Sequence, residues 1–325
     1  MPDVPRPDRR SFLALAAALV AGGGRARAAS DPPASGPSGG AAPMPLEKVA
    51  DGIFVFRAPY EIIAPSNGGA IANMTLIVGA EAAAVVDTGN SRLAGERMLA
   101  AVRATTDRPL RYVVNTHMHP DHTLGNAAFE AQGVRFVAHH KMPRALSVRA
   151  DTYLAQVDRM LGEQGRGTRI VLPDLLVDDT LTLDLGGRVL DLAARPTAHT
   201  DNDLTIRDRN TGTWLLGDLL FVGHVPTLDG SLLGWLDLLG TLAGESAPRV
   251  VPGHGPASVE WPAASEAERR YLAALRDDVR RLIADGRPMG DAPAATAQGE
   301  RGAWSLFDEF NARNAIAAYH ELEWE

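Results

Sequence analysis

Two patterns of apolar and polar positions alternate along this chain, one typical of β-strands and one typical of amphipathic helices. Short runs that are apolar throughout, or that alternate apolar with polar residues, are typical of β-strands. Many of these runs end in Asp, Asn, His or Gly. The pattern predicts strands at 52–57, 74–78, 83–86, 110–115, 134–138, 181–185, 189–193, 204–207, 214–216 and 249–252.

Between these runs, apolar residues recur at the three- and four-residue spacing of amphipathic helices. This spacing predicts helices at 92–105, 123–131, 142–161, 232–243, 265–285 and 311–322. Strands and helices alternate in two blocks, roughly 46–170 and 171–260, each with strands first and a helical segment after them. Such a layout indicates a layered α/β domain with sheets inside and helices outside.

The first 45 residues follow neither pattern. Residues 1–28 combine a charged start, an apolar run from Phe12 to Gly24 and a small-x-small site at Ala26-Arg27-Ala28, as in a secretory signal peptide. Arg9-Arg10 resembles the twin-arginine signal, whose route exports folded proteins; an ordinary secretory signal is the alternative. Both interpretations predict a periplasmic protein. The apolar run is too short to span a bilayer, so we expect no stable membrane insertion of the mature chain.

Residues 29–45 are mostly Pro, Gly, Ser and Ala and predict a disordered linker, after which the folded domain occupies residues 46–325. The formal charge is −8, and it becomes −11 when residues 1–28, with five Arg and two Asp, are removed. This acidity argues against a nucleic-acid partner and is compatible with a small-molecule substrate. The chain has no cysteine, so any metal or catalytic site must use His, Asp and Glu.

One segment, NTHMHPDHTLGN at 115–126, concentrates metal-ligand residues between a predicted strand and a predicted helix. In extended chain, His117 and His119 point to the same side and can share one metal ion. Asp121 and His122 follow where the chain turns into the helix, so their side chains should face a second position beside the first metal ion. Four ligands in this arrangement suit two metal ions rather than one.

Zinc takes about four ligands in proteins, so each ion needs donors from elsewhere in the chain. Three candidates lie at later strand ends or turns: His199 in RPTAHTDND, Asp218 in WLLGDLLF and His254 in VVPGHGP. We expect one site from His117, His119 and His199 and a second from Asp121, His122 and His254, with Asp218 bridging the two.

The ordered segments THMHPDH, AHT, GD and GHG, preceded by AAVVDTG, resemble the metallo-β-lactamase fold superfamily over residues 46–260. The resemblance implies an αβ/βα four-layer sandwich with a C-terminal helical extension and a two-metal site at the edge of its paired sheets. It also implies that Asp87 supports the metal-binding loop. The expected cofactors are two Zn²⁺ ions, with iron or manganese as alternatives.

A two-zinc site of this kind would hold a bridging hydroxide that attacks a small ester, thioester or amide, and Asp121 could pass a proton to the leaving group. The resemblance implies that Asp218 corresponds to the bridging aspartate of glyoxalase II, related thioesterases and sulfur dioxygenases. The absence of cysteine argues against β-lactamases with a Cys ligand. AHTDNDL, GDLLF, LDGSLLGWL and the C-terminal residues look closer to a SoxH-like subgroup of exported zinc metallohydrolases, which implies a link to a periplasmic quinoprotein dehydrogenase.

Several alternatives remain open at this stage. They are a β-lactamase-type or glyoxalase II-type hydrolase, a mononuclear iron sulfur dioxygenase, and a non-catalytic metal-binding accessory protein. His224 and Trp235 are candidates for the substrate pocket, although Trp235 fits a core position better. We expect His139 and His140 to have surface or capping roles and His320 to be structural.

Overall fold

The computed structural model describes residues 41–325. The predicted signal peptide and residues 29–40 of the predicted linker lie outside this range. Residues 41–45 have no regular secondary structure, but Met44 is buried and its backbone N–H donates to Arg97 O at 3.3 Å. The packed part of the chain therefore includes the last residues of the expected linker.

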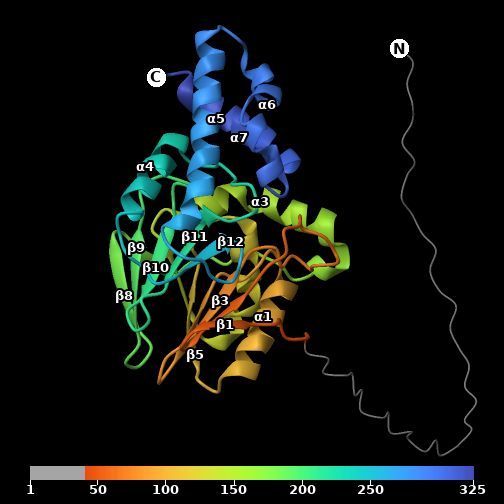
Figure 1. Cartoon of the computed structure of the whole chain (residues 1–325). Helices are drawn as coiled ribbons and strands as arrows, with labels where there is room; N and C mark the ends of the chain where they lie inside the picture. Colours follow the sequence, from red (N-terminus) through yellow and green to blue (C-terminus); the bar gives the residue numbers. More distant parts are fainter. Residues whose placement is uncertain (1–40) are drawn as a thin grey trace, which may run out of the picture. The chain divides into compact units, whose positions relative to one another are not determined.

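Two sheets form the centre of the fold (Figure 1). The first holds seven strands in chain order: β1 (Glu47–Ala50), β2 (Ile53–Phe56), β3 (Met74–Val78), β4 (Ala83–Val86), β5 (Leu110–Val114), β6 (Arg135–His139) and β7 (Leu175–Val177). The second has the order β12-β11-β10-β9-β8, formed by β8 (Thr180–Asp184), β9 (Val189–Ala194), β10 (Leu204–Asp208), β11 (Trp214–Phe221) and β12 (Val250–His254).

The ten predicted strands are all present, with ends shifted by a few residues. The sequence analysis missed β1 and β7, because both are short and most of their residues are not buried, so they carry little apolar signal. It also ended β11 too early. Strand β11 continues to Phe221, so Asp218 lies inside a strand and not after one.

The helices are α1 (Arg92–Thr105), α2 (Pro120–Thr123), α3 (Met142–Leu161), α4 (Leu232–Leu242), α5 (Glu266–Ala284), α6 (Ala292–Ala295) and α7 (Phe307–Leu322). The predicted helix at 123–131 was wrong. Short α2 comes first and is followed by 3₁₀ turns at Leu124–Ala128 and Glu130–Gln132. The carbonyl of His122 accepts from Thr88 N at 3.0 Å and Asn115 Nδ2 at 2.8 Å, so it is not free to continue an α-helix.

Three buried clusters show the layers of the sandwich. Side chains such as Val86, Val114, Leu192 and Ile206 pack between the two sheets. The opposite face of the first sheet packs on α1, and that of the second packs on α4, α5 and α7 (Figure 1). Alternate residues of one strand face opposite layers, as the period of two requires. The predicted αβ/βα arrangement of two sheets between helices is confirmed.

Parallel pairing brings the carboxyl ends of several strands to one edge of the sandwich. Strand β4 pairs in parallel with β5, and β11 pairs in parallel with β12. Asp87 directly follows β4, the 115–122 segment follows β5, and His254 ends β12. Among residues 41–325, no helix has the length and apolar character needed to cross a membrane.

Candidate metal centre

All seven predicted ligands meet at this edge. They form two groups within which the donor atoms lie no more than 4.8 Å apart: His117, His119, His199 and Asp218, and Asp121, His122 and His254. The histidines and Asp121 fall into the two sets that the sequence predicts, and Asp218, the predicted bridge, lies with the first set.

The first group is built around three imidazole nitrogens. His199 Nε2 lies 3.2 Å from His117 Nε2 and 3.0 Å from His119 Nδ1. Tetrahedral zinc with Zn–N bonds of about 2.0–2.1 Å would place its nitrogen ligands about 3.3–3.4 Å apart. The spacing of the three nitrogens is therefore close to that of a zinc coordination shell.

Asp218 connects the two groups. Its Oδ2 lies 3.5 Å from His199 Nε2 and 3.4 Å from His254 Nε2, and its Oδ1 lies 3.2 Å from His122 Nε2. Both Asp218 Oδ1 and His122 Nε2 are fully buried and have no hydrogen-bond partner among the described residues. Buried polar atoms are normally satisfied, so these two fit metal ligands.

Asp87 orients two of the histidines, the role that the resemblance implied. Its Oδ2 accepts from His122 Nδ1 at 2.8 Å and from Thr116 Oγ1 at 2.8 Å. Because the Thr116 hydroxyl donates to Asp87, it accepts from His117 Nδ1 at 3.0 Å. The Nε2 atoms of His117 and His122 therefore carry the lone pairs that face the candidate metal site. Carboxylate–histidine pairs support metal sites in the same way.

The other two histidines of the first group are also held in one tautomer. His199 Nδ1 donates to Thr227 O at 2.7 Å, which leaves its Nε2 as the donor to a metal. His119 is turned the other way: its Nε2 donates to Asp229 Oδ2 at 2.9 Å, and its Nδ1 faces the centre. Sequence reasoning missed Asp229, because 110 residues separate it from His119 and no motif links them.

The charges of the site attract cations. Burial lowers the pKa of His117 well below its ordinary value and that of His199 to about 3, so both are neutral donors. Burial acts in the same direction on His122 and His254, but nearby carboxylates outweigh it. They raise the pKa of His122 well above its ordinary value and that of His254 to about 9. The carboxylate side of the site thus favours positive charge, which metal ions would supply.

Two glycines let Asp218 reach this position. Gly217 has φ of +53°, at a register shift in the pairing of β11 with β12, and a Cβ there would lie 2.6 Å from Thr116 Cβ. A Cβ on Gly253 would lie only 1.9 Å from Asp218 Oδ1. Gly217 has no room for a side chain while Thr116 stays in place, and Gly253 has none while Asp218 does.

The metallo-beta-lactamase superfamily model matches residues 67–254, which is more than half of the chain and contains all seven candidate ligands. The chain belongs to this superfamily. The predicted enzyme class, a hydrolase of the metallo-beta-lactamase superfamily, is therefore confirmed.

Three relatives show how far the likeness extends. A local segment of 57 residues is 39% identical to a linear primary-alkylsulfatase from Pseudomonas sp. (strain ATCC 19151), and covers 18% of this chain and 11% of that protein. The metallo-beta-lactamase from Pontibacter korlensis has a TM-score of 0.58 at 18% identity, covering 71% of this chain and 99% of that one. The sec-alkylsulfatase Pisa1 from Pseudomonas sp. has a TM-score of 0.65 at 16% identity, covering 85% of this chain and half of that one. At these identities the two structures show the fold.

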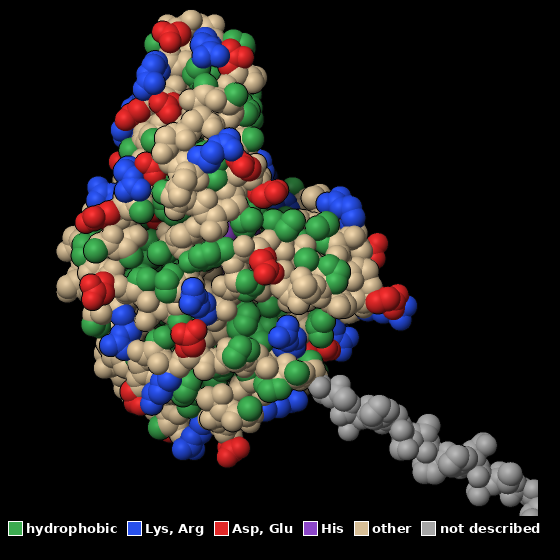
Figure 2. Space-filling model, turned by 45° about the vertical axis from the view of Figure 1, so that its right-hand side comes forward, with side chains coloured by type: hydrophobic (Ala, Val, Ile, Leu, Met, Phe, Trp, Pro, Cys, Tyr) green, Lys and Arg blue, Asp and Glu red, His purple; other side chains and the backbone are tan. Residues whose placement is uncertain are grey.

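In this superfamily member, a cavity of about 540 Å³ opens onto the metal centre, and His119, Asp121, Asp218 and His254 form part of its wall. In Figure 2, the histidine colour is visible at the bottom of a hollow beneath the C-terminal helices. His224 lines the cavity, as predicted, with its ring 4.8 Å from that of His254. The Nδ1 of His224 donates a hydrogen bond to Val225 O at 2.7 Å. Burial lowers the pKa of His224 to about 4, so its imidazole is neutral.

Trp235 does not line the cavity, and its assignment to the substrate pocket is corrected. Its side chain is fully buried in the layer between the second sheet and the helices, and Nε1 donates to Leu219 O at 3.2 Å. The ring centre lies 5.2 Å from that of His199. Trp235 therefore packs behind a metal ligand, on the side away from substrate.

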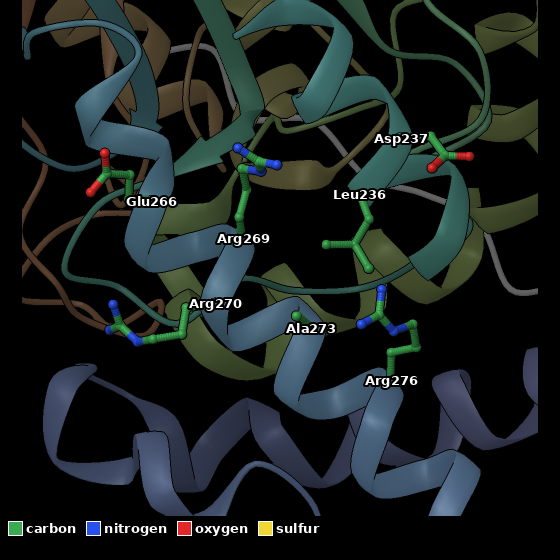
Figure 3. A pocket seen from close by; sticks show the side chains of 7 residues that line it. All are labelled: Leu236, Asp237, Glu266, Arg269, Arg270, Ala273 and Arg276. Carbon is green, nitrogen blue, oxygen red and sulfur yellow. The ribbon is translucent and has the colours of Figure 1, made fainter.

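A second hollow, of about 480 Å³, lies between α4 and α5 (Figure 3). Arg269 and Arg276 extend from α5 beside Leu236 of α4, whereas Arg270 turns away and pairs with Glu300. Neither metal-ligand group contributes to its wall. It has no part in the site described above.

Proposed function

We propose that the chain is an exported binuclear metallohydrolase that cleaves a small ester, thioester or amide. One observation carries the proposal: two groups of metal donors meet at Asp218, a buried carboxylate whose Oδ2 lies near His199 of the first group and His254 of the second, and whose Oδ1 lies near His122 of the second. The donor set contains nitrogen and carboxylate oxygen, which suits zinc, with iron and manganese as alternatives. His117, His119 and His199 would hold one ion, and Asp121, His122 and His254 the other.

Two divalent ions bound there would supply Lewis acidity and a hydroxide nucleophile at neutral pH. The protein positions the reaction around them. The imidazoles of His122, His119 and His199 donate hydrogen bonds to Asp87, Asp229 and the Thr227 carbonyl, which keep them in fixed orientations. Fixed ligands reduce the reorganisation needed during the reaction.

Asp121 is the proposed proton carrier. It lies on the cavity wall with 15% of its side chain exposed, and its Oδ2 is 3.3 Å from His254 Nε2. Burial opposes its ionisation, but His122 and His254 hold its pKa below the ordinary value. An ionised carboxylate at the open side of the centre can accept a proton from the nucleophile and deliver it to the leaving atom.

A sulfate ester is the second candidate substrate. The local sequence match to a primary alkylsulfatase and the fold match to a sec-alkylsulfatase favour it. A sulfate ester and a carboxylic ester would both place their scissile bond against the same donor groups. The two candidates therefore differ in the substrate that is turned over and not in the metal site.

Export and the quinoprotein link belong to the same proposal. Arg9-Arg10 and the apolar run after it support twin-arginine export to the periplasm. The segments AHTDNDL and LDGSLLGWL support a SoxH-like enzyme that works with a periplasmic quinoprotein dehydrogenase. Secretion of a reporter fused to residues 1–45, lost when both arginines become lysine, tests the export route.

A substrate panel tests the hydrolase directly. We expect metal-loaded protein to turn over at least one of a 4-nitrophenyl ester, S-lactoylglutathione, a chromogenic β-lactam and hexyl sulfate, with Asp121→Ala far slower. Oxygen uptake with a persulfide and one iron per chain would instead identify a sulfur dioxygenase. Turnover no faster than that of Asp121→Ala on every substrate would identify an accessory protein.

A further inference from the structure

The cavity at the metal centre is walled by parts of the chain that are distant in sequence. One face of α3 contributes Arg149, Thr152, Tyr153, Gln156, Arg159 and Met160, which recur at helical spacing. Helix α7 contributes Glu309, Phe310 and Arg313 from the opposite side. Because α7 lies beyond residues 67–254, the part of the wall that α7 contributes lies outside the range that the superfamily model matches, whereas α3 lies within it.

Three groups that can bind an anion lie together in this cavity: the guanidinium groups of Arg149 and Arg313 and the hydroxyl of Tyr153. Burial raises the pKa of Tyr153, Asp229 and Asp121 add to this increase, and Arg149 and Arg313 act against it, so both guanidinium groups lie within electrostatic reach of the hydroxyl. Tyr153 therefore stays a neutral donor. Arginine and tyrosine side chains are suitable donors to a carboxylate or sulfate.

Arg313 has no carboxylate partner among residues 41–325, although Glu309 lies one helical turn before it. Arg149 is only loosely paired, with Nη2 3.3 Å from Asp229 Oδ2, and Asp229 is already shared with His119. Arg313 is exposed, so water can solvate its charge, and its guanidinium is available to an anion that enters the cavity.

The rest of the wall is apolar enough to hold a hydrocarbon segment. Ile62, Ile63 and Ile71 from the loop after β2 lie on the cavity wall with Met160 and Phe310. Ile62 keeps 43% of its surface exposed, so its side chain is accessible to an apolar segment of a ligand. Such a mixture of apolar and cationic side chains suits an amphiphilic ligand.

We propose that Arg149, Tyr153 and Arg313 form a subsite for an oxyanion group of the substrate, a carboxylate or a sulfate, whose apolar segment packs on Ile62, Ile71, Met160 and Phe310. This inference rests on the proposed function for the chemistry, but the binding itself does not depend on turnover. Helix α7 is then a specificity element, because it brings Arg313 to the site.

Binding provides the first test. Calorimetry with metal-loaded protein compares hexanoate, hexyl sulfate and uncharged hexan-1-ol. The variant is Arg313→Gln, with Arg313→Lys as a partial rescue, and Arg269→Gln on exposed α5 is the control with the same charge change. We expect Arg313→Gln to weaken binding of the anions about tenfold, the size of one charged hydrogen bond, and binding of the alcohol less than twofold.

Turnover provides the second test. The kcat/KM of mono-(4-nitrophenyl) glutarate relative to neutral 4-nitrophenyl valerate should fall about tenfold in Arg313→Gln and stay as in wild type in Arg269→Gln. Release of sulfate from hexyl sulfate would identify the bound anion as the scissile group, and binding without release would identify it as a second group of the substrate. Both outcomes support the subsite when binding of hexyl sulfate is weaker in Arg313→Gln than in wild type.

Equal anion affinity in wild type, Arg313→Gln and Arg269→Gln would overturn the inference. A protein that binds hexanoate through Arg313 but hydrolyses nothing would overturn the proposed function and leave the subsite standing. The two failures are therefore distinguishable.

Discussion

At the scale of single residues, the metal centre depends on side chains that would not themselves bind metal. Asp87 illustrates this. It has φ of +59°, a conformation that is unfavourable for most residues but accessible to Asp and Asn. From this position its carboxylate accepts three hydrogen bonds, from Thr116 N, Thr116 Oγ1 and His122 Nδ1.

Replacing Asp87 with Asn should weaken metal binding without unfolding the chain. Asn tolerates the same backbone conformation, but its amide nitrogen cannot accept from His122 Nδ1. Loss of such a supporting carboxylate typically lowers metal affinity about 10- to 100-fold. Competition with a fluorescent zinc chelator measures this, with exposed Asp107→Asn as the control. Unchanged affinity in Asp87→Asn would show that the hydrogen bonds to this carboxylate do not support the metal.

At the scale of secondary-structure elements, close contact between β11 and β12 sets the position of Asp218. The Gly253 position in β12 has no space for a methyl group, because its Cβ would meet Asp218 Oδ1 at 1.9 Å. Gly240, in the middle of α4, has no atom within 4 Å of its Cβ position.

Gly253→Ala should therefore displace Asp218 and lose metal, whereas Gly240→Ala should retain it. At this exposed position of α4, the alanine is expected to be neutral or to stabilise the fold by up to about 1 kcal/mol. Metal analysis and thermal unfolding of both variants check this. Full metal content in Gly253→Ala would contradict the bridging position given to Asp218.

Helix α5 is joined to β11 by a buried carboxyl group. Glu268 Oε1 accepts from Phe221 N at 3.1 Å, and Oε2 has no partner within residues 41–325. Burial raises the pKa of Glu268 well above its ordinary value of 4.5. The neutral form is therefore favoured in the folded state, and its contribution to stability is complete below pH 4.5 and is lost as pH rises toward the folded-state pKa.

Glu268→Gln should remove this pH dependence, because the amide keeps an acceptor for Phe221 N and cannot ionise. We expect its unfolding temperature to exceed that of wild type at pH 8 and the difference to shrink at pH 4.5. Exposed Glu266→Gln on the same helix is the control. A difference that is the same at both pH values would count against a neutral Glu268.

At the scale of the whole molecule, the sequence predicted most of the strands and the seven candidate ligands that the fold brings together, because each candidate lies in a short motif in or near an apolar strand. Metal binding by these residues stays a prediction. The sequence did not predict the surroundings of the site. Asp229 is linked to His119 by a contact across 110 residues, and Arg313 reaches the cavity through the packing of α7. Trp235 sits near His199 but behind it. Such relations depend on tertiary packing, which hydrophobic periodicity does not encode.

Metal content tests the central claim most directly. Purified protein, loaded with zinc and dialysed, should hold two ions per chain by elemental analysis. Removing the His119 imidazole takes one nitrogen from the first group and leaves Asp121, His122 and His254 intact. His119→Ala should therefore lose activity and part of its metal while its unfolding temperature changes little. A wild-type content near zero, or full metal and full rate in His119→Ala, would contradict a binuclear centre built from these ligands.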